Sequence, residues 1–111
     1  MKPKIKVWVV FGERVKFGDG RARLFELINE LGSLKKAVGR FGMSYRNAWG
    51  YIRELEQAAG LKFLERTPGG GPRGGTRLTK DGQRFLKRYW KFRRGVDETM
   101  ERQFSRTFPS G

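Results

Sequence analysis

The sequence contains no cysteine and no histidine. Their absence excludes disulfides, thiolate nucleophiles, zinc sites built from Cys or His, and any catalytic triad that depends on histidine. The carboxylates are scattered beside basic residues and form no pair suited to general acid and base chemistry. We therefore expect neither an enzyme nor a protein that holds a metal or other cofactor.

Long apolar runs are missing as well. No stretch approaches the roughly 20 residues that a membrane-spanning helix needs. The opening Met1-Lys2-Pro3 leads into a strand-like segment without the apolar core of a signal peptide. We expect a cytoplasmic protein that makes no membrane contact.

Acidic residues are in the minority. The chain has 25 Lys and Arg against 11 Asp and Glu, a net charge of +14 in 111 residues. Between Lys62 and Arg94 there are eleven basic residues but only two acids, Glu65 and Asp81. A charge of this sign and clustering is typical of a phosphate-binding surface, although a generically basic protein would share the total. The length fits a single domain.

Residues 33–60 show a helix-turn-helix pattern. Two amphipathic segments, 34–41 and 45–59, are separated by Gly42-Met43, and each follows a serine, Ser33 or Ser44, that can cap a helix. The residues expected to face inward are Leu34, Ala37, Val38 and Phe41 in the first segment and Ala48, Ile52, Leu55 and Ala59 in the second.

The opposite side of the second segment is polar. It carries Arg46, Asn47, Gly50, Arg53, Glu54 and Gln57. Arginine and asparagine donate to guanine and adenine edges, and a glycine leaves room for close approach of a nucleic acid. The alternative is an ordinary solvated face. The first segment carries Lys35, Lys36 and Arg40 on its outer side. These residues either contact the phosphate backbone as the helix crosses it or only aid solubility.

The N-terminal residues favour a β-hairpin over residues 4–17. The run Lys4–Phe11 is rich in β-branched and aromatic residues, and Gly12-Glu13 is a plausible turn into residues 14–17. Trp8 and Val10 are too apolar for a solvated sheet face, so we expect a helix or a second subunit to cover them. A first helix over residues 21–31 follows and ends at Gly32.

Residues 61–78 resemble the wing of a winged helix. Two short strands, 61–66 and 76–78, flank a loop rich in Gly and Pro that cannot build a packed core. The loop presents Arg73 between Arg66 and Arg77 to a groove or phosphate backbone. The alternatives are a loop without a ligand and a nucleotide phosphate cradle, although the latter lacks the Gly-Lys-Ser/Thr ending.

Thr79 is predicted to cap a long last helix over residues 79–107. Its apolar residues recur at steps of three and four, whereas Leu86 and Trp90 lie beside this seam and can turn toward the core. The seam consists of Phe85, Tyr89, Phe92, Val96, Met100 and Phe104. A small domain offers no surface long enough to cover this seam, so we expect a second copy of the chain to bury it. The alternative is a helix that packs only on its own domain.

Residues 17–89 resemble the N-terminal winged helix domain of the ModE family of molybdate-responsive transcription regulators. The landmarks are Gly18-Asp19-Gly20, Gly32-Ser33, the run GMSYRNAW over residues 42–49, and Leu78-Thr79-x-x-Gly82, which LysR-type regulators share. The resemblance implies a dimeric DNA-binding domain whose recognition helix begins near Ser44. Asn47 and Gly50 depart from the family and suggest a different operator.

Family members that sense molybdate use a C-terminal oxyanion-binding domain. This chain ends at Gly111 without residues that correspond to it, so we expect no molybdate binding by this chain. The expected fold class is α+β, mainly α: a winged helix-turn-helix with a hairpin at 4–17, a three-helix core at 20–60, a wing at 61–78 and a dimerisation helix at 79–107.

The function predicted from these patterns is a homodimeric transcription regulator that binds an inverted repeat in double-stranded DNA. The expected DNA contacts are Lys35, Lys36, Ser44, Tyr45, Arg46, Asn47, Gly50, Arg53, Arg66, Arg73 and Arg77. Two alternatives remain open: a nonspecific architectural or RNA-binding protein, and a module that docks on another protein.

Overall fold

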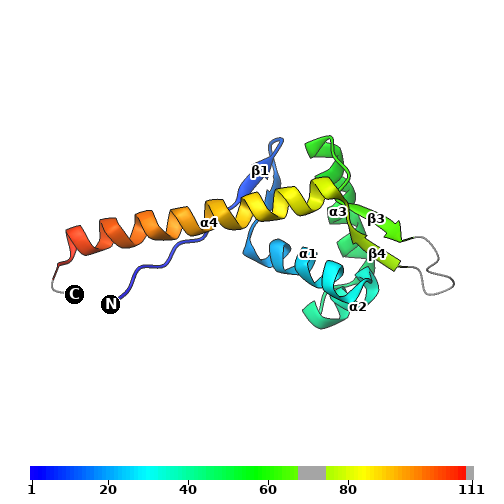
Figure 1. The fold of residues 1–111 in the computed structure, drawn as a ribbon, viewed down its shortest axis with the longest axis horizontal. Helices are drawn as coiled ribbons and strands as arrows, with labels where there is room; N and C mark the ends of the chain where they lie inside the picture. The colour runs from blue at the N-terminus through cyan, green and yellow to red at the C-terminus, as the bar shows by residue number, and fades with distance from the viewer. Residues whose placement is uncertain (68–74, 110–111) are drawn as a thin grey trace.

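The computed structural model describes residues 1–67 and 75–109. Helices dominate and two hairpins accompany them (Figure 1). In chain order the elements are β1 Val9–Phe11, β2 Val15–Phe17, α1 Asp19–Leu31, α2 Leu34–Phe41, α3 Tyr45–Ala59, β3 Leu64–Thr67, β4 Gly75–Leu78 and α4 Lys80–Thr107. The predicted fold class, mainly α with an N-terminal hairpin and a long last helix, is confirmed.

The helix-turn-helix has the predicted boundaries because its caps form as expected. The Ser33 hydroxyl accepts the Lys36 N–H at 3.1 Å, which starts α2. Gly42 ends that helix in the left-handed region, with φ of 65°. Glycine adopts this conformation at no steric cost, so the chain turns sharply into α3.

The core lies between α1, α2, α3 and the start of α4. Its fully buried side chains include Phe25 and Ile28 of α1 and Ile52 and Leu55 of α3. Phe41 was expected to face inward, but it is 37% exposed. It is the last residue of an eight-residue helix, one turn beyond the two residues, Ala37 and Val38, that bury the middle of α2.

The N-terminal hairpin is shorter than predicted. Strand β1 pairs with β2 only from Val9 to Phe11, and Val9 is opposite Phe17, the last residue of β2. The chain enters α1 directly after Gly18, so no partner strand is available for residues 4–8. The predicted strand over these residues is therefore wrong. Instead, residues 1–8 run beside α4 (Figure 1).

No helix within the described ranges covers Trp8 and Val10, which are 52% and 49% exposed. The Lys16 ammonium lies 4.6 Å from the centre of the Trp8 ring. Gly18 supports the same ring, because a Cβ at Gly18 would lie 2.9 Å from Trp8 Cδ1. Trp8 therefore packs on the hairpin and keeps half of its surface open.

The wing begins three residues later than predicted, at Leu64. The Glu56 carboxylate accepts the N–H groups of Phe63 and Leu64 at 2.7 and 3.2 Å, so the approach to the strand is tied to α3. Strands β3 and β4 then pair antiparallel from Leu64 opposite Leu78. The loop between them, with Arg73, lies outside the described residues.

Helix α4 packs on the domain with its first half and extends away from it with its second half (Figure 1). The Phe85 ring lies between 4.8 and 5.5 Å from the rings of Phe11, Phe17 and Phe63, and Tyr89 is 2% exposed. Both were predicted to belong to an intermolecular seam. Tyr89 belongs to the core of its own domain and Phe85 packs against that core, because the hairpin and Phe63, the residue before β3, approach α4 at this point.

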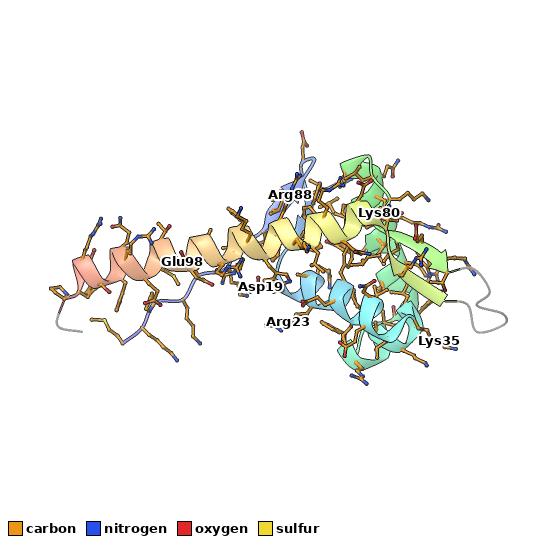
Figure 2. The ribbon with its side chains drawn as sticks, in the orientation of Figure 1. Asp19, Arg23, Lys35, Lys80, Arg88 and Glu98 are labelled. Carbon is orange, nitrogen blue, oxygen red and sulfur yellow. The ribbon has the colours of Figure 1, made fainter. Side chains whose placement is uncertain are left out.

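A polar junction ties α4 to the start of α1. The Tyr89 hydroxyl donates to the Asp19 carboxylate at 2.5 Å, and Arg93 lies 3.3 Å from the same oxygen. Burial and then the hydrogen bond to Asp19 raise the pKa of Tyr89. For Arg93, desolvation acts to lower the pKa, but Asp19 and Asp97 together raise it. Figure 2 shows Asp19 close to the middle of α4.

Candidate nucleic-acid interface

Helix α3 has one buried and one open side. Ala48, Ile52 and Leu55 are fully buried in the core. The residues on the opposite side are all exposed, and we call this side the α3 face. It consists of Arg46, Asn47, Gly50, Arg53, Glu54 and Gln57. The sequence-based assignment of the buried and open sides of α3 is therefore confirmed.

The start of α3 is fixed by a side-chain cap. The Ser44 hydroxyl accepts the Asn47 N–H at 3.0 Å. One turn later the Trp49 ring meets the Tyr45 ring edge-on, with centroids 6.2 Å apart, and Tyr45 remains 47% exposed. The start of α3 thus presents two hydroxyls, that of Tyr45 and that of Ser44. The Ser44 oxygen accepts a hydrogen bond in the cap, so its own O–H can still donate one.

A wing residue, Arg66, lies beside the α3 face. A shallow hollow is lined by Tyr45, Arg46, Trp49, Gly50, Arg53 and Arg66. Arg66 belongs to β3 and is separated from α3 in the sequence. Three arginines thus line one hollow together with Gly50, where an added Cβ would meet nothing within 4 Å.

A second hollow lies between the start of α2, α3 and the wing. Its basic residues are Lys35, Lys62 and Arg66, and Glu56 and Glu65 also line it. Lys35 lies at the wing side of the molecule in Figure 2. Lys62 was not among the predicted contacts. Its position in the strongly basic run from residue 62 onward was the only signal for it in the sequence.

Four of the predicted contacts in the described residues line neither hollow: Lys36, Ser44, Asn47 and Arg77. Lys36 is exposed on α2 but lines neither of them. Arg77 faces Glu65 across the wing and pairs with it at 2.7 Å, with both side chains about half exposed. A pair this exposed contributes little to stability, because water weakens the attraction between the two charges.

Helix α4 carries an apolar groove at the point where it leaves the domain. Ile5 of the N-terminal segment completes it, and Phe92 within it is 49% exposed. We call it the α4 groove; its lining is Ile5, Arg88, Lys91, Phe92, Gly95, Val96, Thr99, Met100 and Gln103. Of the predicted seam, Phe92, Val96 and Met100 therefore line one surface. Phe104 lies beyond it, with its ring 5.2 Å from that of Phe108.

Among residues 1–67 and 75–109, no three metal-binding side chains gather closely enough to hold an ion. None of the helices in the described ranges has an apolar stretch long enough to cross a membrane.

Comparison with curated proteins finds ModE regulators. The chain is 36% identical over 89 residues to the DNA-binding transcriptional dual regulator ModE of Escherichia coli (strain K12), which is 80% of this chain and 34% of that protein. The transcriptional regulator ModE of Haemophilus influenzae is 35% identical over 69 residues, 62% of this chain and 27% of that protein. The chain spans about a third or less of these relatives.

A third relative carries a different name. The molybdenum-pterin-binding protein MopA of Rhodobacter capsulatus is 32% identical over 71 residues, 64% of this chain and 27% of that protein.

The resemblance to ModE regulators drawn from the sequence is confirmed. The family model for the bacterial regulatory helix-turn-helix protein of the lysR family matches residues 20–83. This match covers more than half of the chain, which therefore belongs to the LysR family of bacterial helix-turn-helix regulators.

Proposed function

We propose that this chain is the DNA-binding part of a transcription regulator, that it acts as a homodimer, and that it reads an inverted repeat. The observation that carries the proposal is the hollow on the α3 face. There Arg46 and Arg53 of α3 meet Arg66 of the wing around the open position of Gly50. This supports a surface that accepts a polyanion at close range.

The residues of the α3 face divide by what they can contact. Arg46 and Asn47 lie in the first turn of an exposed helix, where side chains reach base edges in a major groove. Arginine pairs with guanine and asparagine with adenine through two hydrogen bonds each. Arg53, two turns further along, is positioned for a base or a phosphate.

Other groups of this surface are positioned to contact the phosphate backbone of DNA. The hydroxyls of Ser44 and Tyr45 at the start of α3 are donors for a phosphate, and the helix N-terminus favours negative charge there. Lys35, Lys62 and Arg66 surround the neighbouring hollow and extend the same basic surface. Such contacts hold the protein on DNA and carry no sequence information.

The second copy of the chain is proposed to lie in the α4 groove. A half-exposed Phe92 beside Val96 and Met100 is an apolar surface that the described chain leaves open. Helix α4 extends beyond the domain, so two such helices can pair without covering the α3 face (Figure 1). Two copies of α3 would then enter successive major grooves about 34 Å apart.

A salt-controlled titration tests this function. A duplex selected from random sequence and an unselected duplex are each titrated with the protein at several salt concentrations. We expect the selected duplex to bind at least about a thousandfold more tightly. Equal affinities with a steep salt dependence would instead indicate nonspecific nucleic-acid binding, for which the net charge of +14 suffices.

Arg46→Ala and Arg106→Ala form a matched pair of variants for the same titration. Each removes one exposed arginine, from the α3 face and from the last turn of α4 respectively. Arg46→Ala should cost about 1 to 3 kcal/mol on the selected duplex and relax its specificity. Arg106→Ala should leave specificity unchanged. Equal losses from both variants would contradict the assignment of the α3 face.

A further inference from the structure

Helix α4 is continuous from Lys80 to Thr107 and leaves the domain close to Arg93. Before this point, Phe85 and Tyr89 pack into the core. After it, residues 94–107 extend away from the domain (Figure 1), and we call them the arm. Arg93 is the last residue before the arm, and its side chain is only 14% exposed.

Arg93 bonds to three separate parts of the chain. Its Nε donates to the two oxygens of Asp19, at the start of α1, at 3.3 and 3.4 Å. Its Nη1 donates to Asp97, one turn along the arm, and its Nη2 donates to the backbone oxygen of Ile5 at 3.0 Å. One guanidinium thus connects α1, the arm and the N-terminal segment.

These bonds constrain direction more than they add stability. Asp19 and Asp97 are 45% and 48% exposed, so their pairing energy is weakened by water. A guanidinium, however, is planar and has five donors in a fixed fork. When all of its nitrogens are engaged, Arg93 cannot rotate without breaking a bond to one of the three parts.

A small tilt at Arg93 becomes a large displacement at the end of the arm. The arm of 14 residues is roughly 21 Å long, so a tilt of about 15° moves its end by about 5 Å. That exceeds the spacing of one base pair, about 3.4 Å. The direction of the arm therefore determines which spacing between two DNA half-sites a dimer can reach.

We propose that Arg93 is a positioning residue that fixes the direction of the arm relative to α3 and thereby selects the half-site spacing. The selection of a spacing rests on the proposed dimeric DNA binding, whereas the fixed direction is a property of one protomer. Arg93 also holds Ile5 by its backbone at the edge of the α4 groove, where the Ile5 side chain completes the lining.

The direction of the arm can be measured within one protomer. The chain lacks cysteine, so Gln57→Cys on α3 and Arg102→Cys on the arm place two spin labels at defined positions. Dilution with unlabelled protein restricts the measured distance to labels on the same chain. We expect a single narrow distribution that Arg93→Met broadens by about 5 Å. Arg94→Met removes the neighbouring exposed arginine and should leave the distribution unchanged.

Arg93→Met and Arg94→Met, each made without the two labelled cysteines, are then titrated with duplexes whose half-sites differ in spacing by single base pairs, and with a half-site alone. Arg93→Met should reduce the preference for one spacing to about twofold or less and leave half-site affinity within about twofold. A distribution that stays narrow in Arg93→Met would overturn the proposal. If Arg93→Met does not fold, Asp19→Ala, which removes both acceptors of the Arg93 Nε, is used with the same expected results.

Failure of the proposed function has a different signature. If the unsubstituted chain shows no spacing preference or no paired binding, dimeric DNA reading is refuted. The distance measurement does not depend on DNA or on a partner, so a broadened distribution in Arg93→Met still supports the fixed arm. A narrow one still overturns it.

Discussion

Replacing Gly95 by alanine separates the stability of the chain from its self-association. Gly95 lies in the interior of α4 and lines the α4 groove. A Cβ built there would meet nothing within 4 Å, and the backbone is helical. The folded protomer therefore gives no reason for a glycine at this position.

The two expected effects have opposite signs. In the protomer, alanine should increase the free energy of unfolding by about 0.5 to 1 kcal/mol, because glycine is the poorer helix former. In the dimer, a partner helix packed over Gly95 would have to move away from the new methyl group. Overpacking of this kind costs about 1 to 3 kcal/mol, and a two-fold interface contains the methyl group twice.

Two measurements test this. Sedimentation equilibrium over a range of protein concentrations should show that the dissociation constant of the Gly95→Ala dimer is raised about tenfold or more. Urea unfolding at the lowest concentration, where protomers prevail, should show the gain in stability. Gly39→Ala is the control, because Gly39 is also an open helical position but lies on α2. It should stabilise the protomer and leave the dissociation constant unchanged. A Gly95→Ala dimer as tight as the unsubstituted one would refute close packing of a second copy at this point of the groove.

Three further substitutions test other features of the account. Ser44→Ala should lower the free energy of unfolding by about 1 kcal/mol in urea denaturation, because the Asn47 N–H loses its cap; no change would contradict the capping role. Gly82→Ala should destabilise by about 1 to 3 kcal/mol, since its Cβ would lie 2.5 Å from the Phe63 oxygen; a stabilised variant would refute this close contact. Burial raises the pKa of Tyr51 from 10.0 to about 12, so its contribution to stability is complete below pH 10 and is lost as the pH rises toward 12. Tyr51→Phe should therefore lose less stability than the unsubstituted chain between about pH 10 and 12, and an equal loss would show that Tyr51 does not titrate in this way.

The helix-turn-helix was predictable because its signals are local. Apolar periodicity gave the buried side of α3, and Ser33, Ser44 and Gly42 marked where helices start and end. Cap residues act on backbone groups within one turn, so the sequence around each helix end contains the whole interaction.

The errors arose where an element depends on a distant partner. Residues 4–8 have strand propensity, but the strand cannot extend past Val9 because β2 ends opposite it at Phe17. The seam of α4 has the correct helical face, yet periodicity does not say what covers that face. Phe85 and Tyr89 are covered by the chain's own hairpin and core.

The contacts around Arg66 and Arg93 could not be derived from spacing. Arg66 meets the α3 face only because the wing folds back beside that helix. Arg93 and Asp19 are 74 positions apart, and their bond depends on how α4 crosses the start of α1. Clusters assembled from distant segments become visible only once the elements are packed together.

The proposed function requires the α3 face to lie in the major groove of DNA in both copies of a dimer. A photo-crosslinker attached through Glu54→Cys, an exposed position on this face, tests it most directly, because the chain has no other cysteine. On a selected inverted repeat we predict crosslinks at two symmetric positions about one helical turn, or 34 Å, apart. Crosslinks from the matched label at Glu98→Cys on α4, with none from position 54, would contradict the account.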